Sequence, residues 1–245
     1  MTQKTVLVTG SAKRIGAECI RYFHARNYNV VIHYKHSQQE ALSLSQQLNQ
    51  LRANSACCLQ ADLSIMDEVS RLAQQSLAFK GSLDLLINNA SSFYPTKLGS
   101  ITSENWDELM GSNLKGAFFL SQALAPSLAS RHGSIINLVD IYADSGLKDH
   151  PVYSIAKAGV KMMTKVLAQE LAPAVRVNGI SPGAILWPEQ AKSPAEQSST
   201  QQKILAKIAL QRMGEPLDIA QCAWFLAEQA LYCSGQTIRV DGGRA

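Results

Sequence analysis

The chain has 245 residues, of which 46% are hydrophobic and 17% are charged. The apolar content is enough for one full core, and the low charge content argues against a disordered chain, so we expect a single domain over residues 1–245. The net charge of +4 comes from scattered Lys and Arg residues rather than basic blocks, which argues against a nucleic-acid-binding protein.

Seven short apolar runs rich in β-branched residues predict strands that are buried on both faces, and longer segments with helical spacing separate them. In chain order, the expected strands are 5–9, 29–34, 55–63, 83–87, 134–139, 175–180 and 236–240, and the expected helices are 15–26, 38–52, 66–79, 114–131, 152–171 and 216–229. This alternation indicates an α/β fold with a doubly wound parallel sheet and helices on both faces.

The first expected strand runs into a glycine-bearing turn that opens a helix. Backbone N–H groups at the start of a helix bind phosphate well. The candidate cofactor-binding residues in this turn are Gly10, Lys13, Arg14, Ile15 and Gly16. Because the usual G-x-G-x-x-G pattern is not met, the segment alone could also be an ordinary strand-to-helix turn.

The end of the second expected strand lacks the acid that would bind the ribose of NAD(H). Residues 33–37 contain neither Asp nor Glu, and the first acid is Glu40. The side chains there that can donate to a 2′-phosphate are Tyr34, His36 and Ser37, and Lys13 and Arg14 can do so from the glycine turn. The sequence therefore favours NADP(H), and the alternative is a solvated basic corner.

Tyr153 and Lys157 are four residues apart and lie on one face of a predicted helix. A tyrosine with its ordinary pKa near 10 is a poor acid–base catalyst at neutral pH, but a neighbouring cation can lower that pKa by roughly 1–3 units. We therefore expect Lys157 to lower the pKa of Tyr153. The spacing alone is a weak signal, since Tyr and Lys commonly share exposed helix faces.

A polar segment with two prolines, residues 187–200, interrupts the alternation of strands and helices. It follows a strand ending at Pro182-Gly183, and ligands bind at the carboxyl ends of strands in open parallel sheets. We predict a substrate lid over residues 187–209, with Trp187 in the pocket wall; the alternative is a tolerated surface loop.

Other classes of protein are disfavoured. No apolar stretch approaches the roughly 18 residues of a membrane span, and the N-terminus lacks the apolar run of a signal peptide, so we expect a cytoplasmic protein. The five cysteines form no CxxC pair, and the five histidines show no ligand spacing. We expect reduced thiols and no metal site.

Further motifs complete a set spread over the chain: Thr9-Gly10-x-x-x-Arg14-Ile15-Gly16, Ala61-Asp62-Leu63, Asn88-Asn89-Ala90, Asn113, Tyr153-x-x-x-Lys157, Pro182-Gly183 and Asp241-Gly242-Gly243. With this set, the chain resembles the short-chain dehydrogenase/reductase family over essentially its whole length. The resemblance implies a Rossmann fold and a homotetramer built through the helices near 114–131 and 152–171.

The resemblance also implies roles for individual residues. Asp62, followed by Leu63, would hold the adenine ring, Asn89 and Ala90 would line the ribose path, and Lys157 would bind the nicotinamide ribose. Asn113 would complete a proton relay through Lys157 to Tyr153. Pro182 and Gly183 would also contact the cofactor.

Two departures narrow the resemblance. Most family members carry a serine about 13 residues before the tyrosine, where this chain has Asp140, and Arg14 replaces the usual glycine. With residues 88–95 and His33-Tyr34, these features resemble the pteridine reductases of the family, which reduce pterins and folates with NADPH. This implies that Phe93 stacks on the bicyclic ring, with Arg14 and Ser91 as further contacts of substrate and cofactor.

An acid at position 140 suits the reduction of a ring C=N bond, in which a proton must reach a ring nitrogen. Two acids that share a site resist simultaneous ionisation, so Asp140 and Tyr153 should hold one proton between them. The alternatives are that Asp140 only caps the loop after its strand and that Phe93 packs into its own domain.

The predicted function is NADPH-dependent reduction of a dihydropterin or dihydrofolate to the tetrahydro form. One alternative is a ketoreductase for a small carbonyl substrate, which would prefer serine at position 140. The other is a non-catalytic NADP(H)-binding sensor, against which the intact Tyr153 and Lys157 speak.

Overall fold

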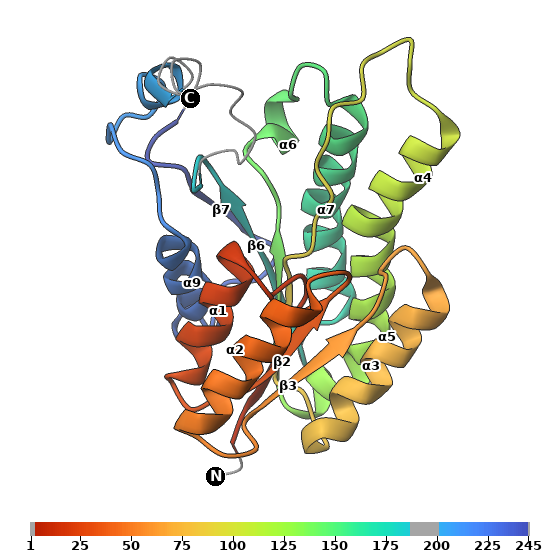
Figure 1. Ribbon diagram of the computed structural model, residues 1–245, viewed down its shortest axis with the longest axis vertical. Coiled ribbons are helices and arrows are strands. Elements are labelled where there is room, and N and C mark those ends of the chain that lie inside the picture. The colour runs from red at the N-terminus through yellow and green to blue at the C-terminus, as the bar shows by residue number, and fades with distance from the viewer. Residues whose placement is uncertain (1–2, 187–200, 245) are drawn as a thin grey trace.

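A seven-stranded parallel sheet forms the middle of the molecule, with the strand order β3-β2-β1-β4-β5-β6-β7 (Figure 1). The computed structural model describes residues 3–186 and 201–244. The strands are β1 (Thr5–Val8), β2 (Asn29–Tyr34), β3 (Ala56–Gln60), β4 (Leu85–Asn88), β5 (Ser134–Leu138), β6 (Arg176–Pro182) and β7 (Thr237–Val240), and neighbouring strands pair in parallel throughout.

The helices cover both faces of this sheet. They are α1 (Arg14–His24), α2 (Gln38–Leu51), α3 (Met66–Lys80), α4 (Ser103–Met110), α5 (Gly116–Ser130), α6 (Tyr142–Ser145), α7 (Pro151–Glu170) and α9 (Pro216–Trp224), with π-helical segments η1 (Gly111–Lys115) and η2 (Phe225–Gln229). No helix within residues 3–186 and 201–244 is long and apolar enough to cross a membrane.

Alternate residues of the central strands enter two separate cores. Val6 and Val8 of β1 pack with residues of α1, α2 and α9, whereas Leu7 packs with residues of α3, α5 and α7. Figure 1 shows the first three helices on one side of the sheet and the other three on the opposite side. Because both faces are buried, these strands are nearly continuous apolar runs, and the predicted doubly wound α/β fold is confirmed.

Helix α4 was not predicted, because Leu109 is its only buried residue and the hydrophobic spacing is therefore weak. Its start carries a local signal instead. The Asn105 N–H donates to Thr102 Oγ1 at 3.3 Å, and the Thr102 N–H donates to Asn105 Oδ1 at 3.2 Å. This reciprocal capping box stabilises the first turn of the helix.

The order of the strands decides where a ligand can bind. β1 lies between β2 and β4, so the chain runs in one direction across the sheet from β1 to β3 and in the other from β4 to β7. The crevice outside the carboxyl ends of β1 and β4 is the usual ligand site in such sheets. Gly10 follows β1 and Asn89 follows β4, so both lie at this position.

Candidate active site

The turn after β1 packs directly against the segment after β4. Gly10 has a φ of +61°, and a β-carbon on it would lie 2.8 Å from the Cα of Ala90. A β-carbon on Gly16 would lie 2.6 Å from the carbonyl oxygen of Gly10 and 2.7 Å from Nδ2 of Asn89. Both glycines are therefore required by close approach, and α1 begins within this turn at Arg14.

Side-chain hydrogen bonds lock the same two segments together. Thr9 Oγ1 accepts the N–H groups of Asn89 at 2.9 Å and Ala90 at 3.0 Å. Asn89 Nδ2 donates to the carbonyl oxygens of Thr9 at 2.8 Å and Gly10 at 3.0 Å. The structure thus brings the predicted residues Gly10, Gly16, Asn89 and Ala90 to one place at the sheet's switch point. Ile15 packs against the core beneath them, and Leu63 is buried.

His33 connects this turn to Ala61, the residue after β3, a role that the sequence analysis did not assign. Its Nδ1 accepts the Gly10 N–H at 2.8 Å, so the ring proton is on Nε2, which lies 3.0 Å from the carbonyl oxygen of Ala61. Burial lowers the pKa of His33 to about 4, and the ring is neutral at physiological pH. The available signal was one histidine inside a strand whose residues are all buried.

Two side chains expected to contact the cofactor, Lys13 and Asp62, form ion pairs with protein groups in this structure. Lys13 Nζ lies 2.6 Å from Glu40 Oε1, and Lys35 Nζ lies 2.8 Å from Asp62 Oδ2. Asp62 also accepts hydrogen bonds from the backbone and side chain of Ser64. Burial alone would raise the pKa of Asp62, but the bonds from Lys35 and Ser64 outweigh it and lower the pKa to about 2.

The other residues expected at the 2′-phosphate differ in exposure. Tyr34 is buried in the core beneath α1 and α2, so its ring does not contribute to the exposed corner. His36 is exposed and Ser37 is half-buried just before α2. Arg14 stands in the left-handed region, with φ +55°, where related motifs carry glycine. Arg14, His36 and Ser37 therefore remain the candidates for this corner.

The structure brings Asp140, after β5, into contact with Tyr153 of α7. Tyr153 Oη donates to Asp140 Oδ2 at 2.6 Å, and the Tyr142 N–H donates to Asp140 Oδ1 at 2.8 Å. The carboxylate therefore both caps the turn after β5 and contacts the phenol, which combines the two interpretations that the sequence left open. Lys157 Nζ donates to the carbonyl oxygen of Leu138 at 2.9 Å.

The expectation that Lys157 lowers the pKa of Tyr153 was wrong. Burial raises the pKa of Tyr153 above its ordinary value, and the charge and hydrogen bond of Asp140 raise it further, against a smaller opposing effect of Ser91. Lys157 Nζ lies 5.8 Å from the Tyr153 ring centroid and donates to Leu138 instead. Burial also lowers the pKa of Lys157 to about 8, although the charge of Asp140 opposes this.

Asn113 lies in the π-helical segment η1. It contacts the site through Ser91 and not through Lys157 as expected. Its Oδ1 accepts from Ser91 Oγ at 2.5 Å, and its Nδ2 donates to the carbonyl oxygens of Ser92 at 3.0 Å and Leu109 at 2.9 Å. Among the described residues, no hydrogen bond joins Asn113 to Lys157. Ser91, which lowers the pKa of Tyr153 slightly, connects Asn113 to the catalytic candidates.

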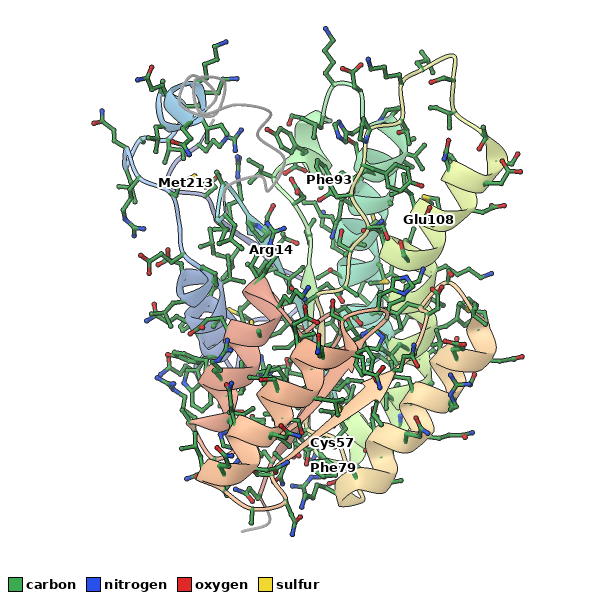
Figure 2. The ribbon with its side chains drawn as sticks, in the orientation of Figure 1. Arg14, Cys57, Phe79, Phe93, Glu108 and Met213 are labelled. Atoms are coloured by element: carbon green, nitrogen blue, oxygen red, sulfur yellow. The ribbon has the colours of Figure 1, made fainter. Side chains whose placement is uncertain are left out.

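Phe93 follows β4 on the same end of the molecule as Arg14 (Figure 2). The residue is 57% exposed, so Phe93 does not pack into the core of its own domain. The Phe93 ring meets the Tyr153 ring edge-on, with 4.8 Å between centroids and 79° between planes. An exposed aromatic ring thus lies directly beside the Tyr153–Asp140 pair.

Pro182 and Gly183 lie at the carboxyl end of β6, beside β7. The Gly183 N–H donates to the carbonyl oxygen of Val240 at 3.0 Å, and a β-carbon on Gly183 would lie 2.6 Å from the Cα of Asp241. Trp187 and residues 187–200 of the predicted lid lie outside the described residues, and residues 201–205 are helical. In the described part of the chain, no group of three or more His, Cys, Asp or Glu side chains could hold a metal ion.

A doubly wound sheet with a glycine turn at its switch point and an adjacent tyrosine–lysine pair is the architecture of a dinucleotide-dependent oxidoreductase. The family model described as Enoyl-(Acyl carrier protein) reductase matches residues 10–245. The chain belongs to the short-chain dehydrogenase/reductase family, whose members bind NAD(P)(H).

Three relatives show how broad that family is. The chain is 34% identical to a 3-oxoacyl-acyl-carrier-protein reductase of Staphylococcus epidermidis. The 243 aligned residues cover 98% of this chain and 98% of the relative. The chain is 33% identical to pteridine reductase 1 of Leishmania tarentolae, over 99% of this chain and 96% of the relative. It is 31% identical to glucose 1-dehydrogenase 2 of Bacillus subtilis, over 99% and 95% respectively. These similar identities support an oxidoreductase but do not distinguish between the substrates of the three relatives. The substrate must therefore be inferred from the residues of the site.

Proposed function

We propose that this oxidoreductase reduces a pterin or folate with NADPH, taking a dihydropterin or dihydrofolate to the tetrahydro form. The observation that carries the proposal is the 2.6 Å hydrogen bond from Tyr153 Oη to Asp140 Oδ2. A carbonyl oxygen gains negative charge as hydride arrives, and an adjacent carboxylate opposes that charge. The same carboxylate instead favours protonation of a ring nitrogen, because the nitrogen gains positive rather than negative charge.

The residues present fit the cofactor at its phosphate end. The close approach at Gly10 and Gly16 leaves no room for side chains, and the first N–H groups of α1 suit a diphosphate. Arg14, His36 and Ser37 would contact the 2′-phosphate, and Asn89, Ala90, Pro182 and Gly183 the rest of the dinucleotide. Lys157 and Tyr153 would contact the nicotinamide ribose. NADPH, when bound, supplies the hydride.

The chain's own residues would supply the proton. Tyr153 Oη would pass its proton to the ring nitrogen, and Asp140 would hold the phenol through the hydrogen bond that it accepts. The pair would then take up one proton from solvent. Donation leaves a phenolate next to a carboxylate, and the ammonium of Lys157 offsets part of that charge. Because the pair must be protonated again before each turnover, we expect kcat to decline as pH rises in the alkaline range.

Phe93 would provide the wall against which the bicyclic ring stacks. Its 57% exposure and its edge contact with Tyr153 support this role, because a flat ring resting on it lies within reach of the proton donor. Aromatic rings favour such contacts with planar heterocycles. Ser91 and Arg14 would contact the polar edge of the substrate.

Reduction of a small carbonyl substrate is the second candidate function. Its support is the 34% identity to a 3-oxoacyl-acyl-carrier-protein reductase. The acid at position 140 speaks against it, since the family's carbonyl reducers keep a serine that donates to the substrate oxygen.

A homotetramer built through α5 and α7 is the proposed assembly. Large apolar side chains exposed on these two helices support it: Phe118, Phe119, Ile155, Met162 and Val166. Light scattering coupled to size-exclusion chromatography would measure the mass, and a monomer would contradict the assembly.

The functional proposal is tested by following NADPH oxidation with dihydrobiopterin, dihydromonapterin, dihydrofolate and a panel of ketones. We expect turnover with at least one dihydropterin or dihydrofolate and little with the ketones. Turnover confined to the ketones would replace the proposal with the second candidate.

A further inference from the structure

The loop that precedes α7 holds an aromatic residue with no assigned role, His150. Its imidazole stacks on the ring of Phe93, with 4.7 Å between ring centroids and 8° between planes. One face of Phe93 is therefore covered by His150, while the residue as a whole remains 57% exposed. The Tyr153 ring lies at 79° to the Phe93 ring and so does not stack on it.

Hydrogen bonds fix the position of His150. Its Nδ1 lies 2.9 Å from the carbonyl oxygen of Lys148, which orients the ring. The carbonyl oxygen of His150 accepts from Ser154 Oγ at 2.9 Å, and the same hydroxyl accepts the Leu147 N–H at 3.0 Å. The loop is thus tied at two points to the first turn of the helix that carries Tyr153.

A backbone hydrogen bond joins this loop to the segment that carries Phe93. The Thr96 N–H donates to the carbonyl oxygen of Asp149 at 2.7 Å. The stack and this bond together connect the chain after β4 with the start of α7. The orientation of Phe93 relative to Tyr153 is therefore set by contacts with residues 149–150.

We propose that His150 is a positioning residue: it backs one face of Phe93 and presents the opposite face to a planar substrate. An exposed phenylalanine without such a partner samples several rotamers, and the substrate must then order it at an entropic cost. A parallel stack removes part of that cost before binding. The inference rests on the proposed function for the identity of the planar substrate.

Steady-state kinetics with a dihydropterin test the proposal in three variants. Aromatic pairs of this kind contribute enough for His150→Ala to raise KM about two- to tenfold. We expect kcat and the NADPH dissociation constant to stay near wild type, and His150→Tyr to restore KM because it keeps an aromatic ring. Lys148→Ala, an exposed side chain of the same loop, is the matched control and should leave KM unchanged.

A double variant separates positioning from a general structural effect. If His150 acts through Phe93, adding His150→Ala to Phe93→Ala should not raise KM further. The ring contact has its own readout in 19F NMR of protein labelled with 4-fluorophenylalanine, where Phe93→Leu identifies the Phe93 signal. His150→Ala should shift that signal.

Three results would overturn the proposal: an unchanged or lower KM in His150→Ala, additive effects in the double variant, or an unmoved Phe93 signal. If the wild-type enzyme turns over ketones but no pterin, the proposed function fails separately. KM is then measured with the best ketone, and an unchanged KM in His150→Ala overturns the role of His150 as well.

Discussion

The buried imidazole of His33 makes acid stability a test of how the cofactor end is held together. Its pKa is lowered from 6.5 to about 4, because burial disfavours the charged ring. Between these values the unfolded chain binds a proton that the folded protein does not bind. The free energy of unfolding therefore falls as the pH falls from 6.5 towards 4, and the difference corresponds to about 3 kcal/mol.

The variant His33→Gln isolates this contribution, since glutamine does not titrate. Its loss of hydrogen bonds to Gly10 and Ala61 should lower the free energy of unfolding by about 1–3 kcal/mol at neutral pH. On acidification to about pH 4, however, it should lose about 3 kcal/mol less than the wild-type protein, because both share every other titrating group. The gap between the two proteins should therefore close or reverse.

Urea denaturation followed by tryptophan fluorescence, over pH values from about 7 to about 4, measures both quantities. His132→Gln is the matched control, because His132 is exposed, and it should keep the wild-type pH dependence. Parallel curves for wild type and His33→Gln would refute the reasoning, since His33 would then bind its proton equally in both states.

Three further outcomes follow from the proposed site. Tyr153→Phe should lower kcat strongly while NADPH still binds in a fluorescence titration, and near-normal turnover would mean that the proton comes from elsewhere. Phe93→Ala should weaken the binding of diaminopteridine antifolates by about 1–3 kcal/mol in calorimetry, and unchanged affinity would exclude stacking. NADPH should give a higher kcat/KM than NADH, because no acid follows β2 to bind a ribose hydroxyl; equal values would refute this.

The fold could be predicted from the sequence because its signal is repeated along the chain. The central strands β1, β2, β4 and β5 are fully buried and rich in apolar residues, such as Val6 to Val8, and burial on both faces produces that pattern. Helix α4 was not predicted because it buries only Leu109, and hydrophobic spacing detects only helix faces that pack against the core. Its capping box at Thr102 was the signal to use.

The sequence predicted which residues belong to the candidate site better than it predicted which partners they contact. Spacing places Tyr153 and Lys157 on one face of α7, but it does not say that Lys157 turns to the carbonyl oxygen of Leu138. The partners Lys13–Glu40 and Lys35–Asp62 lie on different elements, so only the tertiary structure brings them together.

The roles of the two histidines next to the site could not be predicted for the same reason. His33 bonds to Gly10 and Ala61, and His150 stacks on Phe93, all of which are distant in sequence. A histidine in a buried strand or before a helix has many uses, and its partner decides which one applies. Sequence patterns describe one element at a time, and these contacts join several.

The central claim is that the acid at position 140 directs the enzyme to a ring nitrogen, and Asp140→Ser tests it most directly. The measurement is a pH profile of kcat for wild type and variant with a dihydropterin and a small ketone, alongside a fluorescence titration of NADPH. We predict that the wild-type enzyme reduces the dihydropterin with a kcat that declines as pH rises in the alkaline range, because the pKa of Tyr153 is raised above its ordinary value and the Asp140–Tyr153 pair loses its shared proton only there. The variant should bind NADPH, lose most pterin reduction and gain weak activity on the ketone. Full pterin turnover by Asp140→Ser with an unaltered pH profile would contradict the account.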